Sequence, residues 1–224
     1  ESKPAAQGWL TAKPRRVLSD RLENAYDPEQ GGWGNGHKFL QADVLDFMLG
    51  RAAAGDAVAA ARARFTLMQA EALIDPVWGG IYQYSDDGTW NSPHYEKIMS
   101  AQANAVRLYA TASIVLGDAE FKDAAMRIAA YMLTHLRDPG GGFYPSQDAD
   151  LSAQFKGKAF YALDDAGRRA LGEPRVDTNL YAREAGWAIS ALVSLYEASG
   201  ETRWLSAATG AARWAVAQRM YEAG

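Results

Sequence analysis

The chain has 224 residues, of which 48% are hydrophobic and 22% charged, and this composition is typical of a globular protein with a sizeable core. A net charge of −4 without a Lys/Arg cluster argues against a nucleic-acid partner, and short, interrupted apolar runs argue against a membrane span. The absence of cysteine excludes disulfides, cysteine zinc sites and thiol nucleophiles, and only three histidines argue against a multi-histidine metal site.

Segments with apolar residues three or four positions apart are predicted to be helices. In chain order they lie near 15–26, 41–54, 56–74, 94–116, 118–136, 181–199 and 202–220. Alanine is frequent in them, which favours helix and permits close packing. Three short turns join pairs of these helices: Gly55-Asp56, Gly117-Asp118 and Gly200-Glu201. The glycine can end one helix in the left-handed conformation, and the acid suits the start of the next.

Longer loops of a second kind lie between these pairs. Each has Asp-Pro followed by adjacent glycines and then an aromatic or apolar residue: Asp27-Pro28 to Trp33, Asp75-Pro76 to Tyr82, and Asp138-Pro139 to Tyr144. Proline stops a helix, and paired glycines allow a tight reversal. The stretch 141–163 is less regular, and we expect a short β-hairpin there with Phe160-Tyr161 on one strand.

Long loops and short turns alternate strictly along the chain. Successive helices with short connections run antiparallel, so this order places loops 27–39, 75–93 and 138–160 at one end of the array. About eight helices, in four hairpins, are expected in this all-α repeat architecture. The alternative is a generic helical repeat whose aromatic loops only pack.

The loop sequences resemble a known family. Residues 79–85 (GGIYQYS), Trp90 and residues 93–99 (PHYEKIM) are similar to its signature G-G-[FI]-x-x-Y-S…W…P-H-F-E-K-M-L. Residues 141–150 (GGFYPSQDAD) and 31–34 (GGWG), with Lys38-Phe39, are similar to G-G-F-Y-S-[AS]-Q-D-A-D and G-G-F-G…P-K-F. The family is that of the spermatogenesis-associated, thioredoxin-like proteins, and the resemblance implies an N-terminal thioredoxin-like domain followed by a six-hairpin, glycosidase-like α/α toroid.

Two positions depart from the family pattern. His37 stands where the family usually has proline, and residues 183–187 (REAGW) stand where it commonly has a Trp-Asn-Gly segment. A full toroid has twelve helices, so we interpret residues 1–224 as a single, partial toroid domain with the thioredoxin-like domain absent. An open ring exposes the flanks of its terminal hairpins, and we expect self-association through them.

The resemblance also implies a sugar site, because such toroids resemble glycoside hydrolases and sugar 2-epimerases that bind sugar at one mouth of the ring. Aromatic and polar groups in a concavity suit a sugar. The residues expected to contact it are Trp33, Lys38, Tyr82, Tyr84, Trp90, Tyr144 and Gln147. The alternative is that the aromatic rings plug the centre of the toroid.

Four residues are candidates for catalysis. His94 follows Pro93 at the expected start of a helix, where an imidazole can serve as general acid or base, and Glu96 lies in the same first turn. Both could instead only start the helix. Asp148 and Asp150 could supply the paired carboxylates of a glycosidase, oxygen ligands for Ca²⁺, or only turn contacts.

We therefore expect a carbohydrate-active, glycosidase- or sugar 2-epimerase-like domain that binds a sugar at the long-loop face. The alternative is a non-catalytic binding or scaffold module attached to a thioredoxin-like domain. The site prediction is that His94 and at least one of Asp148 and Asp150 line one solvent-accessible concavity, with Trp33 or Trp90 in its wall. Tyr181, Glu184 and His135 are interpreted as structural. We expect no metal, cofactor, nucleic acid or membrane partner, and a cytoplasmic location, with which the lack of cysteine is compatible.

Overall fold

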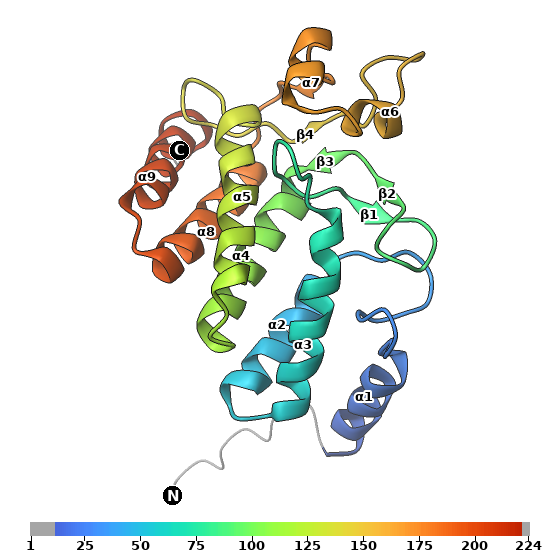
Figure 1. Ribbon diagram of the computed structural model, residues 1–224. Coiled ribbons are helices and arrows are strands. Elements are labelled where there is room, and N and C mark those ends of the chain that lie inside the picture. Colours follow the sequence, from blue (N-terminus) through green and yellow to red (C-terminus); the bar gives the residue numbers. More distant parts are fainter. Residues whose placement is uncertain (1–11, 221–224) are drawn as a thin grey trace, which may run out of the picture.

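The computed structural model describes residues 12–220, and most of them are helical (Figure 1). The helices are α1 (Ala12–Ala25), α2 (Ala42–Ala53), α3 (Ala57–Ala70), the 3₁₀ turn η1 (Glu71–Leu73), α4 (Met99–Val115), α5 (Ala119–His135), α6 (Gly157–Tyr161), α7 (Asp165–Leu171), α8 (Ala182–Ser199) and α9 (Thr202–Arg219). The strands are β1 (Tyr84–Ser85), β2 (Pro93–His94), β3 (Lys97–Ile98), β4 (Ser146–Gln147) and β5 (Val176–Asp177). Strand β1 pairs with β2, and β4 lies between β3 and β5; all pairs are antiparallel.

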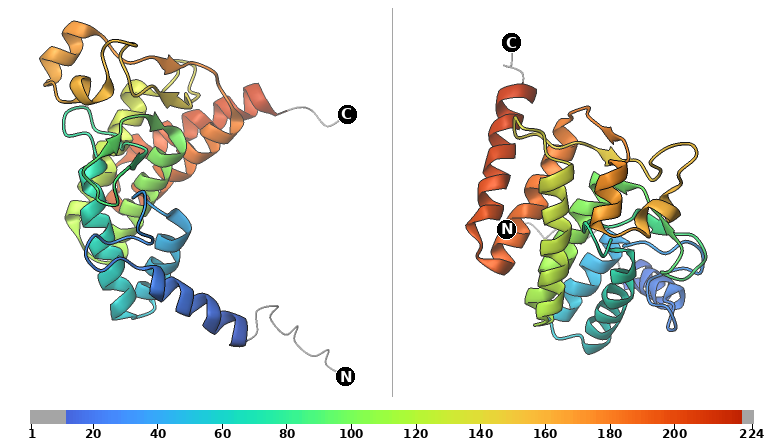
Figure 2. Two further views of the ribbon diagram at one scale, coloured as in Figure 1. Left: turned by 90° about the vertical axis from the view of Figure 1, so that its right-hand side faces the viewer. Right: turned by 45° about the horizontal axis from the view of Figure 1, so that its top comes forward.

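Three antiparallel hairpins, α2–α3, α4–α5 and α8–α9, form the body of the molecule. Helix α4 packs against both α2 and α8, so the first helices of the hairpins make one layer, and each carries its own second helix. The array is curved, with α1 at one end of the arc and α9 at the other (Figures 1 and 2). This is the predicted α/α-toroid architecture, in the form of an arc.

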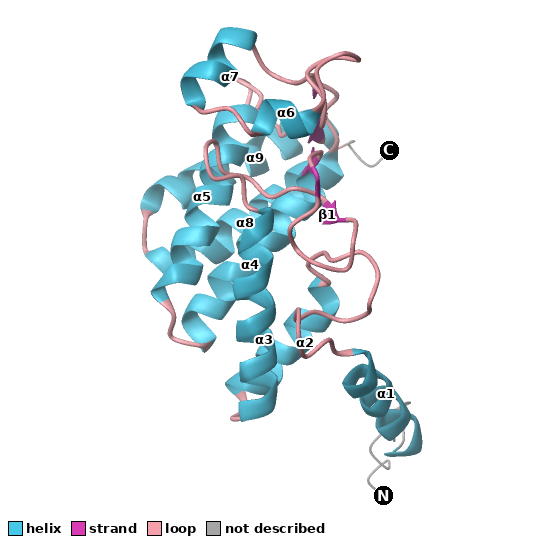
Figure 3. Cartoon of the chain, turned by 45° about the vertical axis from the view of Figure 1, so that its right-hand side comes forward, coloured by secondary structure: helices cyan, strands magenta, loops and turns pink. Residues whose placement is uncertain are grey.

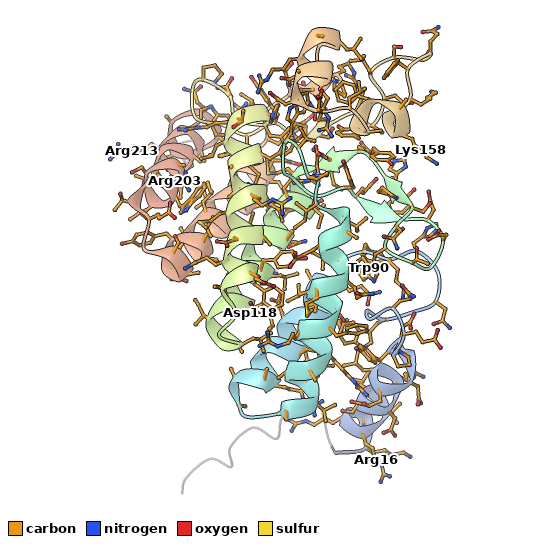
Figure 4. The ribbon with its side chains drawn as sticks, in the orientation of Figure 1. Arg16, Trp90, Asp118, Lys158, Arg203 and Arg213 are labelled. Carbon is orange, nitrogen blue, oxygen red and sulfur yellow. The ribbon has the colours of Figure 1, made fainter. Side chains whose placement is uncertain are left out.

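The long loops lie together at one end of the array, as the alternation of turns predicts. Figure 3 shows them gathered on one side, with the short turns at the opposite end of the helices. In Figure 4, Asp118 in a short turn and Lys158, on α6 near the end of the third long loop, lie at opposite ends of the helix array.

The short turns use the expected chemistry in two of the three hairpins. Gly55 and Gly117 have positive φ, and the side chains of Asp56 and Asp118 accept hydrogen bonds from the backbone amides of Ala59 and Glu120. In the third turn the C-cap glycine of α8 is also left-handed, but Glu201 makes no side-chain cap and instead pairs with Arg203.

The three Asp-Pro loops are copies of one backbone motif. In each, the aspartate amide donates to the carbonyl of the last glycine before the apolar residue, at 2.9–3.0 Å for Asp27, Asp75 and Asp138. Each aspartate side chain also accepts from an amide two residues ahead. The aspartate and the glycines of this motif are therefore required by the loop itself, whatever the loop binds.

A lysine completes the first two loops. Lys38 Nζ donates to Asp27 Oδ2 at 2.6 Å and to the carbonyl of Gly31, and Lys97 Nζ donates to Asp75 Oδ2 and to the carbonyl of Gly79, both at 2.8 Å. In the third loop the hydroxyl of Tyr144 donates to the aspartate instead.

The second loop contains a fully buried ion cluster. The Arg168 guanidinium binds both oxygens of Asp75, at 2.7 and 3.0 Å, and all three side chains of Asp75, Lys97 and Arg168 have no exposed surface. The rings of Tyr131 and Tyr161 face the Lys97 ammonium at 4.2 and 5.0 Å. Because Arg168 lies on α7, its bonds to Asp75 connect α7, which follows the third long loop, with the second long loop.

Two local predictions are wrong. The helix expected from residue 94 begins at Met99, because residues 93–98 are extended and pair as β2 and β3. The β-hairpin lies in the second long loop rather than in 141–163, and Phe160-Tyr161 belong to α6, where both rings are buried against other aromatic rings. Tertiary packing, rather than local pattern, decides both.

We expect the free energy of unfolding to rise with pH between about pH 8 and about pH 9.5. Burial lowers the pKa of Lys97 from 10.5 to about 8, although Asp75 opposes the shift. In this window the unfolded chain binds more protons than the folded chain, so stability increases with pH. Above about pH 10 the trend reverses, because tyrosines ionise in the unfolded chain while burial raises the pKa of Tyr82 and Tyr131 in the folded one.

Urea titrations at about pH 8 and about pH 9.5 would measure this slope. Lys97→Met removes the titrating group and leaves Asp75 paired with Arg168, so its slope should be flatter than that of the wild-type chain. Equal slopes in the two proteins would contradict the assignment.

Several large apolar side chains are exposed near both ends of the arc. They include Val17 and Leu18 on α1, and Leu205 and Val216 on α9. Self-association through these flanks stays a prediction. Within the described residues, no helix has the length and apolar character needed to cross a membrane.

Candidate functional site

The extended segment 94–98 organises the long-loop face. Tyr95 and Lys97 point to its buried side, where both contact the Tyr161 ring. His94 and Glu96 point to the other side, with Nε2 and Oε2 3.7 Å apart. This alternation follows from extended backbone, in which every second side chain shares a face.

An aromatic stack holds His94 in place. Because Tyr84 lies opposite His94 in the β1–β2 pair, their rings stack with centroids 4.9 Å apart and planes 11° from parallel. The exposed ring of His37 meets the Tyr84 ring edge-on at 5.1 Å. The His94 side chain is 40% exposed. The imidazole is therefore oriented by a neighbour and open to solvent, rather than sealed in the core.

A first cavity lies beside Tyr84. It has a volume of about 690 Å³ and opens where the N-terminal turns of α2 and α4 meet the first and second long loops. Its polar lining is supplied by side chains including Gln41, Asp43, Gln83, Ser100 and Asn104. Its apolar lining includes Phe39, Leu40, Val44, Ile81, Tyr82, Tyr84 and Ile98.

A second cavity, of about 510 Å³, lies beside Glu96. Asp148, Asp150 and Arg175 line it together with the loop 149–153. Strand pairing explains why Glu96 and Asp148 are close together. Lys97 lies opposite Gln147 in the antiparallel β3–β4 pair, Glu96 precedes Lys97, and Asp148 follows Gln147.

The three carboxylates of the second cavity are engaged differently. Asp148 accepts from Arg175 Nε at 3.0 Å, and Asp150 accepts from Lys156 Nζ and from the Gly157 amide, both at 2.8 Å. Within residues 12–220, Glu96 accepts no hydrogen bond from a lysine, an arginine or the backbone, and its ionic neighbour is His94. Glu96 is thus the carboxylate most available to a ligand.

The electrostatics of Asp150 limit its role. The Lys156 ammonium and the Gly157 amide hold the pKa of Asp150 below its ordinary value, and His94 adds to this effect. The side chain therefore stays ionised near neutral pH, which suits a hydrogen-bond acceptor and not a general acid. Within the described chain, no group of three or more carboxylate or imidazole side chains is arranged to hold a metal ion.

The structure brings together part of the expected site. His94 and Glu96 form a pair, and Glu96, Asp148 and Asp150 share the second cavity, whereas Tyr82 and Tyr84 line the first. Neither cavity is lined by His94, Trp33 or Trp90, so the expectation that His94 shares one concavity with an aspartate, with a tryptophan in its wall, is wrong.

The other expected sugar contacts support the loops from inside. Trp33 and Trp90 are 5% and 2% exposed, and the Trp90 indole donates to the carbonyl of Gln30. Lys38 is bonded to Asp27 in the first long loop. Gln147 is fully buried and accepts a hydrogen bond from the Tyr131 hydroxyl. Tyr144 is partly buried and bonded to Asp138.

Sequence reasoning missed several residues. Arg175 lines the second cavity and Asn104 the first, and Arg168 completes the ion cluster. No motif marks these three positions, because each reaches its partners only through the tertiary fold. The two lysines could be found from the sequence, since Lys38 and Lys97 each follow a loop in which paired glycines come after Asp-Pro.

Comparisons with known proteins agree with this fold. None of the known protein-family profiles matches the sequence. Spermatogenesis-associated protein 20 of Rattus norvegicus is 34% identical over 137 residues, which are 58% of this chain and 17% of the rat protein. The matched segment is thus a small part of that relative, and the likeness concerns the toroid part of the resemblance alone.

Several solved structures with a similar fold carry the names of sugar enzymes. Cellobiose 2-epimerase from Bacillus thermoamylovorans matches with a TM-score of 0.70 and 14% identity, covering 93% of this chain and 55% of the epimerase. A family 76 glycoside hydrolase from a bovine Bacteroides thetaiotaomicron strain matches with a TM-score of 0.67 and 14% identity, covering 92% of this chain and 43% of the hydrolase. At this identity the likeness establishes the six-hairpin, glycosidase-like toroid fold.

Proposed function

We propose that the long-loop face binds a carbohydrate, with the His94–Glu96 pair at the centre of the site. The observation that carries this is the position of the pair: it is solvent-accessible, its imidazole is stacked on Tyr84, which lines the first cavity, and Glu96 lines the second cavity. An aromatic ring beside hydrogen-bonding groups in a concavity suits a sugar, which has apolar C–H faces and a rim of hydroxyls.

The chemistry of the pair supports acid–base work on the bound sugar. An imidazole can accept or donate a proton at its ring nitrogens, and a carboxylate 3.7 Å away can orient it. Asp148 and Asp150, each held by a cation, would then accept hydrogen bonds from sugar hydroxyls. The fold adds support, because its solved neighbours include an epimerase acting on cellobiose and family 76 mannosidases.

A binding screen tests the proposal. We would use two neutral series, glucose with cellobiose and cellotriose, and mannose with its α-1,6-linked dimer and trimer, because the names of the solved neighbours refer to these sugars. Isothermal titration calorimetry on the protein should detect at least one binder. Turnover of the same sugars, followed by chromatography, would show whether the site is catalytic.

Glu96→Gln is expected to weaken binding of that sugar by about tenfold or more, because a charge-assisted hydrogen bond contributes about 1.5–3 kcal/mol. His94→Ala should have a similar effect on binding and should abolish any turnover. Glu197→Gln makes the same change at an exposed position on α8 and should leave affinity unaltered. If no sugar binds, or if both site variants bind like the wild-type protein, the scaffold role takes precedence.

A further inference from the structure

We infer that the ligand is an oligosaccharide of at least two units, with one unit in each cavity and the His94–Glu96 pair beside the linkage between them. This rests on the proposed carbohydrate-binding function and makes its substrate class more specific. It starts from the presence of two separate cavities on one face, where a monosaccharide needs only one.

The two cavities are adjacent along a single strip of backbone. Ile98 lines the first cavity and Glu96 the second, and the two residues are neighbours on the same side of the extended segment. Two residues of extended chain span about 6.6 Å. Lining residues of the two cavities are therefore only about 6.6 Å apart along the backbone, a spacing that a ligand of two linked rings can span.

His94 marks the boundary between them. Its ring is stacked on Tyr84, which lines the first cavity, and its Nε2 faces Glu96, which lines the second. A ligand that extends from Tyr84 to Glu96 would pass beside this imidazole. The groups able to move a proton would then lie at the linkage rather than at a chain end.

The two cavities have different linings, and each lining can contact one unit of the oligosaccharide. The first combines the rings and aliphatic groups around Tyr84 with polar groups that include Asn104 and one carboxylate, Asp43, so it can contact an apolar sugar face. The second is bounded by three carboxylates and Arg175, so its contacts are chiefly hydrogen bonds to hydroxyls. Both volumes, about 690 and 510 Å³, lie within the usual range for small-molecule sites.

The length dependence of binding tests the inference. In calorimetry with the two sugar series, the dimer of the binding series should have a dissociation constant at least about tenfold lower than its monomer, equivalent to about 1.4 kcal/mol. Equal affinity of monomer and dimer would overturn the two-cavity inference while leaving the proposed function intact. Failure of every sugar to bind would overturn both.

A blocking variant locates the second unit. Ala153 is exposed on the loop that lines the second cavity, so Ala153→Trp places a bulky ring there without disturbing the core. This variant should bind the dimer no more tightly than the monomer, and its affinity for the monomer should stay within about threefold of that of the wild-type protein. Ala170→Trp, at an exposed position of α7 outside both cavities, is the matched control. It should still bind the dimer more tightly than the monomer, by the same factor as the wild-type protein. A folded Ala153→Trp protein, checked by circular dichroism, that still binds the dimer more tightly by this factor would also refute the inference.

Discussion

Replacing Asp75 by alanine is expected to lower the free energy of unfolding by about 3–5 kcal/mol, because it leaves two buried cations without their counter-ion. Asp75, Lys97 and Arg168 are all completely buried, and the carboxylate receives hydrogen bonds from both cations. The change also removes an acceptor from the Val77 amide. A loss of this size is a large fraction of the stability of an ordinary domain.

Urea unfolding of Asp75→Ala and of an exposed control measures this effect. Asp86 is 54% exposed at the side chain, so Asp86→Ala should change stability by no more than about 1 kcal/mol. A second comparison isolates the cause. If uncompensated charge is responsible, Asp75→Ala combined with Lys97→Met should be more stable than Asp75→Ala alone. A loss below about 1 kcal/mol in Asp75→Ala would contradict the structural role of the cluster.

Gly79→Ala is expected to be a strongly destabilising single-methyl addition in the long loops. Gly79 has φ of +72°, and a Cβ at this position would lie 2.5 Å from the backbone carbonyl oxygen of Arg127 on α5. Left-handed backbone costs a residue with a Cβ about 1–2 kcal/mol, and overpacking adds about 1–3 kcal/mol. The backbone oxygen cannot rotate away as a side chain can, so loop and helix must separate.

Gly117→Ala is the matched control for this prediction. Gly117 has nearly the same φ, +70°, but no atom of the described residues lies within 4 Å of the position that an added methyl group would take. The free energy of unfolding of Gly117→Ala should therefore fall only by the conformational cost of about 1–2 kcal/mol. Thermal or urea unfolding that shows equal losses for the two variants would rule out the steric contribution at Gly79.

The repeat architecture could be predicted because its determinants are local. Glycine followed by aspartate ends one helix and caps the next, as Asp56 and Asp118 show, and Asp-Pro with paired glycines closes a long loop on its own backbone. Since these signals alternate strictly, the common end of the long loops follows from counting reversals, without knowledge of any long-range contact.

The candidate site could be predicted only in part. The motif around His94 and Glu96 drew attention to the correct segment, but its expected helix is extended chain, because pairing with β1 and β4 competes with local helix formation. The same motif contains Lys97, whose environment is set by α7, a distant element that supplies Arg168.

The order of residues along the chain was enough to predict the hairpins, their direction and the end of the molecule on which function is to be sought, because each depends on turns and caps formed by neighbouring residues. Which motif residues face solvent followed from tertiary packing alone. Trp33, Lys38 and Trp90 are buried as supports of the loops, while His94, Glu96 and Asp148 remain accessible. Burial depends on what other segments pack against a loop: Arg168 comes from α7 and binds Asp75, and no local pattern connects these two residues.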